Sequence, residues 1–299
     1  MLSILIPTFN YNVYRLVLEI KQQCDLCGIS YEIIVQDDAS NSVLNEENKK
    51  INQLANCVFY QNEINQGRSK NRNLLAEKAT FDWLLFLDAD TFPKKSNFIS
   101  VYLENLNQKM DAINGGIVYQ NQKPKNTELL RWIYGIKREA LSSEVRNKNE
   151  YLSFLTLNFL IKKSVFKVVK FNEEIPNLRH EDTLFSFDLK NAKFKVLHIN
   201  NPVIHLGLDT SEEFLIKSEE AVKNLNYLFD KQLISQDYVG ILNLSKQLKN
   251  YHLSWVFTCF FGLVKWQIKK NVLGKKPNLF LFDLYRLNYL LSLETTSNK

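Results

Sequence analysis

Short apolar runs alternate with amphipathic segments along the first 120 residues. The apolar runs predict strands over residues 2–6, 31–35, 58–60, 83–87 and 112–119. Apolar positions at helical spacing predict helices over residues 14–24, 43–54, 69–79 and 96–108. Strands that alternate with helices favour a parallel sheet flanked by helices, so the fold class predicted is α/β. We expect Pro7 to end the first strand.

The second half of the chain gives weaker signals. Residues 120–150 are polar and basic, which predicts a loop and one helix over 129–141. Further predicted elements are a strand over 151–161, a helix over 179–189, two short strands over 194–198 and 202–205, and helices from 211 almost to the end.

The composition fits a folded protein of one large domain, or one domain with an appendage. The chain has 299 residues, 45% of them hydrophobic, which suffices for a sizeable core. Residues 2–7 read as a strand rather than a secretory leader, so we expect a cytoplasmic protein. Cys24 and Cys27 have C-x-x-C spacing, but no second pair or nearby His completes a zinc site, which favours reduced thiols.

The net charge of +6 is carried by the C-terminal segment. Residues 244–299 contain nine Lys and Arg against two acids, which leaves 29 bases and 30 acids in residues 1–243. This asymmetry predicts an anionic partner for the C-terminal segment and argues against a nucleic-acid-binding core.

Two carboxylates follow the most apolar strand. Residues 83–87 run directly into Asp88 and Asp90, at the strand end where open α/β sheets bind ligands. Two acids so close repel each other unless a cation lies beside them, and a divalent metal shared with substrate phosphates would supply one. The alternative is an ordinary turn in which Asp caps the backbone, with residues 91–93 leading into a helix.

Four ordered motifs in the first 120 residues resemble those of family 2 glycosyltransferases. They are Leu5-Ile6-Pro7-Thr8-Phe9-Asn10, Glu32-Ile33-Ile34-Val35-Gln36-Asp37-Asp38-Ala39-Ser40, Asn65-Gln66-Gly67 through Arg72-Asn73, and Asp88-Ala89-Asp90. Glu181-Asp182 and His205 extend the resemblance past residue 200. No single motif is decisive, but their order and spacing together are specific.

The resemblance implies a GT-A type fold and an inverting sugar transfer. The donor would be a nucleotide-diphosphate sugar, and the acceptor a hydroxyl of a glycan or lipid-linked molecule in cell-surface polysaccharide synthesis. The implied cofactor is a divalent cation, Mn²⁺ or Mg²⁺. Residues 1–120 would form the nucleotide-sugar-binding half and 121–210 the acceptor-binding and catalytic half, followed by a helical region over 211–299.

The resemblance also implies donor-binding residues. Asp38 would accept hydrogen bonds from a uridine-like nucleotide, although an Asx-turn explains the same residues. Pro7 and Thr8 would line the same pocket, and Gly67 would permit a positive φ. Arg72 would pair with the donor or with Asp38, unless it belongs to a solvated face. Asp88 would hold ribose or a metal-bound water.

The metal ligands and the catalytic base complete the predicted site. Asp90 is the preferred metal ligand, and His205 resembles a further one, although a lone His after apolar residues is often a structural residue. By the same resemblance, Asp182 rather than Glu181 is the candidate general base, since it makes the second acid of the pair the base. A carboxylate is suited to deprotonate the acceptor hydroxyl during inversion. The alternative is that acids favour the first turn of any helix.

The C-terminal segment has two interpretations. Residues 253–264 form an apolar run too short to span a bilayer, with Trp255 and Trp266 at its edges and five lysines following. A helix lying in the interface of an anionic membrane fits this pattern, and would place the enzyme on the inner face of the cell membrane. A core helix with a solvated basic end fits it equally.

Other functions are weighed against this one. A nucleotidyltransferase would show a Gly-rich basic loop after the first strand, and a dinucleotide oxidoreductase would show G-x-G-x-x-G; neither occurs here. A catalytically degenerate nucleotide-sugar-binding or assembly protein is the remaining alternative. The presence of Asp38, Asp88, Asp90, Asp182 and His205 together argues against it.

Overall fold

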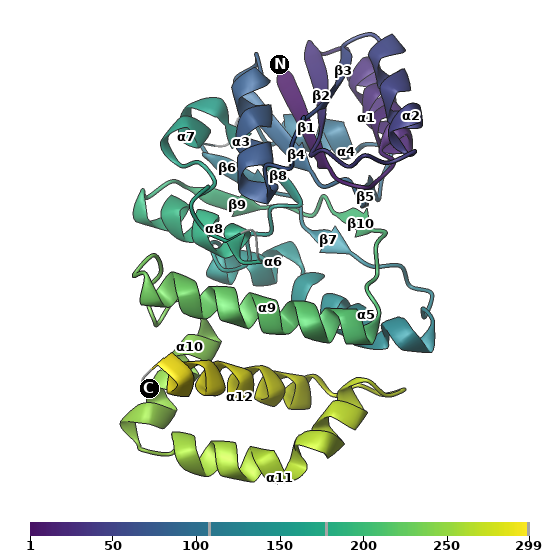
Figure 1. Ribbon diagram of the computed structural model, residues 1–299. Coiled ribbons are helices and arrows are strands. Elements are labelled where there is room, and N and C mark those ends of the chain that lie inside the picture. The colour runs from purple at the N-terminus through teal and green to yellow at the C-terminus, as the bar shows by residue number, and fades with distance from the viewer. Residues whose placement is uncertain (107–108, 177–178, 298–299) are drawn as a thin grey trace. The chain divides into compact units, whose positions relative to one another are not determined.

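The structure is a computed structural model in which residues 1–106, 109–176 and 179–297 are described, the last four of these for their backbone alone (Figure 1). The chain forms two compact units. The first comprises residues 1–120, 139–177 and 181–207, and the second comprises residues 121–138, 178–180 and 208–299.

A seven-stranded mixed sheet is the centre of the first unit. Its strands are β1 (Leu2–Thr8), β2 (Tyr31–Asp37), β3 (Cys57–Gln61), β4 (Trp83–Leu87), β6 (Ala112–Asn114), β8 (Asn158–Lys162) and β9 (Val196–His198), in the order β3-β2-β1-β4-β8-β6-β9. The first four strands in this order run parallel, and β8 is antiparallel to both of its neighbours. The predicted α/β fold class is therefore confirmed.

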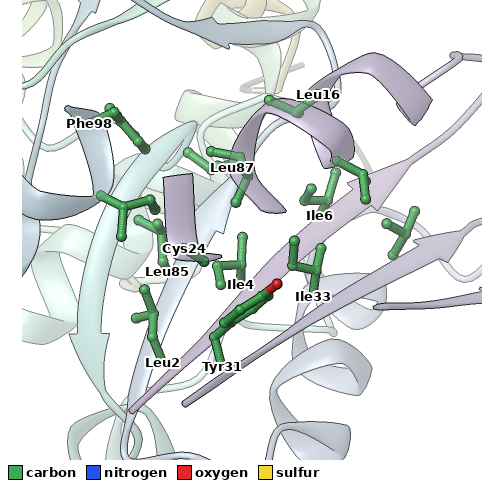
Figure 2. Packing of buried hydrophobic residues seen from close by; sticks show 14 of the residues in the cluster. Leu2, Ile4, Ile6, Leu16, Cys24, Tyr31, Ile33, Leu85, Leu87 and Phe98 are labelled. Atoms are coloured by element: carbon green, nitrogen blue, oxygen red, sulfur yellow. The ribbon is translucent and has the colours of Figure 1, made fainter. Parts of the chain in front are cut away.

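Helices cover both faces of this sheet. They are α1 (Tyr14–Cys27), α2 (Asn45–Asn48), α3 (Arg68–Lys78), α4 (Phe98–Glu104), α6 (Ser143–Arg146), α7 (Lys163–Val168) and α8 (Glu181–Asn191). Because strand side chains alternate, Ile4 and Ile6 pack with α1 in one buried cluster, which Figure 2 shows, whereas Leu5 packs with α3 in another. Burial on both faces explains why these strands read as unbroken apolar runs.

Pro7 does not end β1, contrary to the sequence prediction. The N–H of Leu2 points towards β2, where it donates to Ser30, so alternation turns the nitrogen of Pro7 towards β4. Pairing with β4 stops at Leu5, which pairs with Phe86. The missing N–H of Pro7 therefore costs the sheet no hydrogen bond, and β1 continues to Thr8.

Two predicted helices are shorter than expected. Residues 43–54 form α2 and then a 3₁₀ helix, Lys49–Gln53, because asparagine side chains bond to backbone outside the helix: Asn48 donates to Tyr11 O at 2.9 Å and Asn52 accepts from Phe59 N at 2.8 Å. Residues 96–108 form α4, which ends at Glu104; 107 and 108 lie outside the described residues.

The predicted strand over 151–161 is largely a turn. Its first residues form turns, in which the N–H of Phe154 donates to Tyr151 O. Only the residues from 158 onwards pair with the sheet, as β8. Phe154 lies in this turn and is buried in the core. The apolar run over 151–161 therefore did not distinguish a strand from a packed loop.

A second, three-stranded sheet lies in the same unit. Its strands are β5 (Thr91–Pro93), β10 (Val203–His205) and β7 (Ile117–Val118), in that order. In the alternative to a metal site, residues 91–93 form a turn that leads into a helix; they are instead a strand, antiparallel to β10. The predicted strand over 112–119 breaks at Gly115 and Gly116 into β6 of the large sheet and β7 of the small one.

Arg146 holds this crossing between the two sheets. Its buried guanidinium donates to Asn114 Oδ1 at 2.8 Å and to Ile199 O at 2.7 Å. Gly116 has φ 84°, and a Cβ there would lie 2.6 Å from Arg146 Nη2, so glycine is required on both counts. Arg146 also donates to His198 Nδ1 at 2.7 Å, which leaves the proton on Nε2, bonded to Glu150 O.

The second unit is helical, as predicted for residues after 211. Its helices are α5 (Leu129–Tyr134), α9 (Ser211–Asp230), α10 (Gly240–Asn250), α11 (Ser254–Val272) and α12 (Leu279–Ser297). The helix predicted over 129–141 is divided: α5 ends at Tyr134 and a π-helical turn, Gly135–Glu139, follows. A capping box between Thr210 and Glu213 starts α9. The core of this unit comprises Leu130, Phe214, Leu215, Phe261, Ile268, Val272, Phe282 and Tyr285.

Because His198 is buried and neutral, we expect the fold to lose stability in acid. Burial lowers the pKa of His198 from 6.5 to about 4, opposed by its bond to Glu150 O. As the pH drops, His198 is therefore protonated in the unfolded chain before it is protonated in the folded one. The free energy of unfolding falls by about 3 kcal/mol between pH 6.5 and about 4. In chemical denaturation at several pH values, His198→Gln should flatten this slope, whereas His252→Gln, at an exposed site, should keep it. An unchanged slope in His198→Gln would contradict the assignment.

Candidate active site

Four parallel strands end at one edge of the large sheet. Thr8 pairs with Asp37 at the ends of β1 and β2, and Leu5 pairs with Phe86 of β4, so Asp38 and Asp88 follow the ends of the two strands that flank β1. This edge is where open α/β sheets bind ligands. Because β1, β2, β3 and β4 run in the same direction, the four separate motifs that follow them lie at the same edge of the sheet.

Asp37 and Asp38 have different partners. Asp37 is buried and accepts from the N–H and hydroxyl of Ser40, so the Asx-turn explains Asp37. Asp38 accepts instead from the backbone N–H groups of Gln66 at 2.8 Å and Gly67 at 2.9 Å, and from the Asn62 amide. The Asp38 carboxylate therefore holds the loop that leads into α3.

Gly67, the N-cap residue directly before α3, has the positive φ that the sequence predicted. Its φ is 83° and ψ 166°, a conformation open essentially to glycine alone. Thr8 is buried, and its hydroxyl donates to Tyr11 O at 3.2 Å. Asp38 and Gly67 are therefore in direct contact, while Pro7 and Thr8 lie at the adjoining strand end.

Arg72 on α3 is the electrostatic centre of the site. Its side chain is 7% exposed, so the solvated-face alternative is wrong. Its partner is Asp88 at 2.7 Å rather than Asp38, and a second carboxylate, Glu181, lies 3.7 Å away. The guanidinium also lies over the ring of Phe171. Burial lowers the pKa of Arg72, but Asp88 and Glu181 outweigh it and hold the pKa above its ordinary value.

Asp182 lies in the first turn of α8, beside Glu181. Burial raises the pKa of the Asp182 carboxyl, opposed by the N–H of Thr183 at 2.7 Å and by the charges of Arg72 and Arg68. Arg68 pairs with Glu181 at 3.4 Å. Asp182 thus combines a raised proton affinity with cationic neighbours, which is a typical environment for an acid–base catalyst.

Asp90 and His205 form a separate pair, brought together by the small sheet. In the register of β10 with β5, His205 pairs with Thr91, and the N–H of Leu206 donates to Asp90 O at 2.8 Å. His205 Nε2 consequently lies 3.4 Å from Asp90 Oδ2. A Cβ on Gly207 would lie 3.1 Å from that oxygen, so glycine gives the carboxylate room.

The Asp90–His205 pair offers one oxygen and one nitrogen donor to a cation. Across the described parts of the chain, no group of three or more His, Cys, Asp and Glu is placed to hold a metal. His205 Nδ1 is buried and has no hydrogen-bond partner among the described residues, which is unusual for a purely structural His. Two protein donors fit a divalent ion that takes its other ligands from phosphate or water.

Sequence reasoning missed three residues of this site. Glu181 was set aside in favour of its neighbour, yet it joins Arg72. Tyr11 lies three residues beyond β1 at the same sheet edge; burial raises its pKa, and so does the charge of Asp90. Tyr119 stacks obliquely 5.5 Å from the His205 ring, and no pattern in the sequence linked the two.

Comparisons with known proteins agree with this arrangement. The model of the family described as "Glycosyl transferase family 2" matches residues 3–170, more than half of the chain and nearly all of the strand-end motifs. The chain belongs to glycosyl transferase family 2. Two curated relatives, both described as uncharacterised glycosyltransferases from Haemophilus influenzae, extend the similarity. One is 26% identical and aligns with 84% of this chain and 88% of its own; the other is 22% identical, with 78% and 89% covered.

Solved structures share the fold. A mannosyltransferase from Pyrobaculum calidifontis has a TM-score of 0.63 and 10% identity over all of this chain and 87% of its own. TarS from S. aureus has a TM-score of 0.50 and 18% identity over 76% of this chain; the chain spans 43% of TarS. At these identities the likeness shows a GT-A type fold alone.

Family membership makes the chain a glycosyltransferase that uses a nucleotide-sugar donor. Within the described residues, no helix has the length and apolar character needed to cross a bilayer.

Proposed function

We propose that this chain is a metal-dependent inverting glycosyltransferase. The observation that carries the proposal is the Asp90–His205 pair at the sheet edge, in the same unit as the Arg72 cluster and Asp182. Asp90 and His205 would hold Mn²⁺ or Mg²⁺. The mixed oxygen and nitrogen donors favour Mn²⁺ over Mg²⁺, which prefers oxygen alone. The structural neighbour from Pyrobaculum calidifontis was solved with GDP-Man and Mn²⁺, which supports this choice of cofactor class.

The cation, when bound, neutralises the charge that develops on the departing nucleotide diphosphate. The chain's own residues supply the rest. Asp38 orders the loop at Gly67, so that backbone there can approach the donor. Pro7 and Thr8 line the nucleotide side, and Asp88, oriented by Arg72, offers its remaining acceptor capacity to the donor.

Asp182 acts as the general base in this proposal. A buried carboxylate with a raised pKa binds a proton better than an ordinary aspartate does, so it accepts the proton of the acceptor hydroxyl as that oxygen attacks. Arg72 and Arg68 keep its ionised form accessible despite burial. The acceptor is a glycan or lipid-linked hydroxyl, and the pathway is cell-surface polysaccharide synthesis.

The exposed side of α11 supports a membrane-surface location on the cytoplasmic side. This helix buries Phe261, Ile268 and Val272 in its own unit but leaves Leu263 78% exposed. Trp255, Phe260 and Trp266 are exposed as well. Large apolar and aromatic side chains beside lysines suit the interface of an anionic bilayer. One side of α11 is thus a core helix and the opposite side suits a membrane interface, so both interpretations of this segment apply to the same helix.

Replacing the proposed base should stop transfer without weakening donor binding. We expect Asp182→Asn to lower kcat by about 10²–10⁴-fold, the range for a general base, with the donor Kd nearly unchanged. Turnover and calorimetric donor affinity measure the two effects. Asp188→Asn, on the same helix, is the control. Equal loss of binding and turnover would remove Asp182 from this role, and a parent that binds donor but neither transfers nor hydrolyses it would favour the degenerate-binder alternative.

Removing the proposed metal ligand should change the cation dependence. Asp90→Ala should abolish the stimulation of turnover by Mn²⁺ and weaken direct Mn²⁺ binding, measured by electron paramagnetic resonance of the free ion. Asp82→Ala, at the other end of β4 and exposed, should change neither. Full activity of the parent protein in excess chelator would refute the metal assignment.

The exposed side of α11 should govern attachment to vesicles. Leu263→Ser should reduce co-sedimentation with vesicles of equal parts phosphatidylcholine and phosphatidylglycerol, because it removes apolar area from the interface. Leu26→Ser is a matched control, since Leu26 is also 78% exposed but lies on α1 of the other unit. Identical partitioning of both variants would exclude this role for α11.

A further inference from the structure

A pocket of about 720 Å³ lies entirely within the helical second unit. This volume is in the range of small-molecule sites. Its walls come from α5, the residues on either side of α5, the loop between α11 and α12, and the start of α12. One part of the lining is apolar and aromatic: Leu129, Trp132, Ile133, Pro277, Leu279 and Phe280.

The other part of the lining is strongly basic. Lys123, Lys137, Arg138, Lys275 and Lys276 border the pocket, and no acid does. Arg138 is neutralised by Asp283 at 2.7 Å. Within the described chain, none of the four lysines forms an ion pair with a carboxylate. Their charges therefore add over a small volume and favour an anionic ligand.

The loop that carries two of these lysines is held in place. Asn278 N donates to Asn271 Oδ1 at 3.0 Å, which ties the start of α12 to the end of α11. Asn278 Oδ1 in turn accepts from the N–H of Phe280 at 2.8 Å. Lys275 and Lys276 thus stand before the positive end of a 19-residue helix, on a loop fixed at both ends.

We propose that this pocket binds a phosphorylated amphiphile: a phosphate or diphosphate group contacts the lysines, and the attached hydrocarbon chain packs on Trp132, Ile133 and Phe280. A purely anionic ligand would leave the apolar half of the lining unexplained, and a purely apolar ligand would leave the basic half unexplained. The inference deepens the proposed function, on which it rests for its meaning, because such a ligand is either the lipid carrier of the acceptor or a phospholipid of the bilayer.

Soluble amphiphiles test the pocket without vesicles. Isothermal titration of the full chain should show binding of geranyl diphosphate or dihexanoyl phosphatidic acid, and binding of inorganic pyrophosphate and of geraniol at least about tenfold weaker. Tighter binding of geranyl diphosphate identifies a lipid carrier as the source, and tighter binding of phosphatidic acid a bilayer lipid.

Matched charge variants locate the site. Lys275→Ala/Lys276→Ala should weaken binding of the amphiphile by about tenfold or more, since each lost contact to a charged group is worth about 1.5–3 kcal/mol. Lys265→Ala/Lys269→Ala removes the same charge from exposed positions of α11 outside the pocket and should leave binding unchanged.

Three results would overturn the proposal: no binding of either amphiphile, pyrophosphate binding as tightly as geranyl diphosphate, or equal weakening in both double variants. Donor hydrolysis in the presence of Mn²⁺, measured on the same preparations, reports on the first unit alone. Its persistence without amphiphile binding would reject the pocket and keep the glycosyltransferase mechanism, and its absence in the parent would count against the mechanism instead.

Discussion

The active-site edge of the sheet depends on the ion pair that the buried guanidinium of Arg72 forms with Asp88. A charge taken out of water is stable only if paired, and Arg72 is paired with Asp88 at the end of β4 and lies near Glu181 on α8. Without it, Asp88 would lose its ion-pair partner, and the positive charge beside the two acids of α8 would be left to Arg68, whose side chain is exposed. Because α3 carries Arg72, and Asp38 fixes the loop from which α3 starts, the loop and the charge cluster form one connected framework.

The same framework gives Asp88 and Asp90 different chemistry, although they are two residues apart. Asp88 already has a cation of the protein beside it, so mutual repulsion does not require a metal there. The Asp90 carboxylate instead lies 3.4 Å from His205 Nε2, a side chain that can itself be a metal ligand. The metal proposed from the paired acids is therefore assigned to Asp90 rather than to Asp88. The absence of a side chain at Gly207 leaves room at the Asp90 oxygen that faces His205.

The sequence predicted the central strands well because each is a run of buried apolar residues that ends in a polar motif. It predicted the Asp38, Gly67 and Asp88 neighbourhood for the same reason, since parallel strands end together. The pairing of the small sheet was not predicted, although a short strand was expected over 202–205. Its strands β5, β7 and β10 have two or three residues each, too few to show a period, and they join residues more than eighty positions apart in the chain.

For Arg72, the sequence left open a solvated position that the structure contradicts, and the reason is different. Its neighbours Arg68 and Lys70 are basic and exposed, which made the whole face look solvated. Helical spacing could have indicated that Arg72 is buried, because it lies three and four residues before Leu75 and Ala76, which are both buried. A charged residue on the buried side of a helix needs a partner, and the nearest acids at a strand end are the natural candidates.

The second unit combines features that exclude a purely sugar-binding surface. Neutral glycans are bound through hydroxyl groups, which require neither unpaired lysines nor large exposed apolar side chains. Here the exposed side of α11 carries large apolar and aromatic side chains among its lysines, a combination that water alone does not favour for a helix at a protein surface. The unpaired lysines of the pocket add a preference for anions. Apolar contact and positive charge together select a ligand that is both lipid and phosphate, whereas either alone would accept many partners.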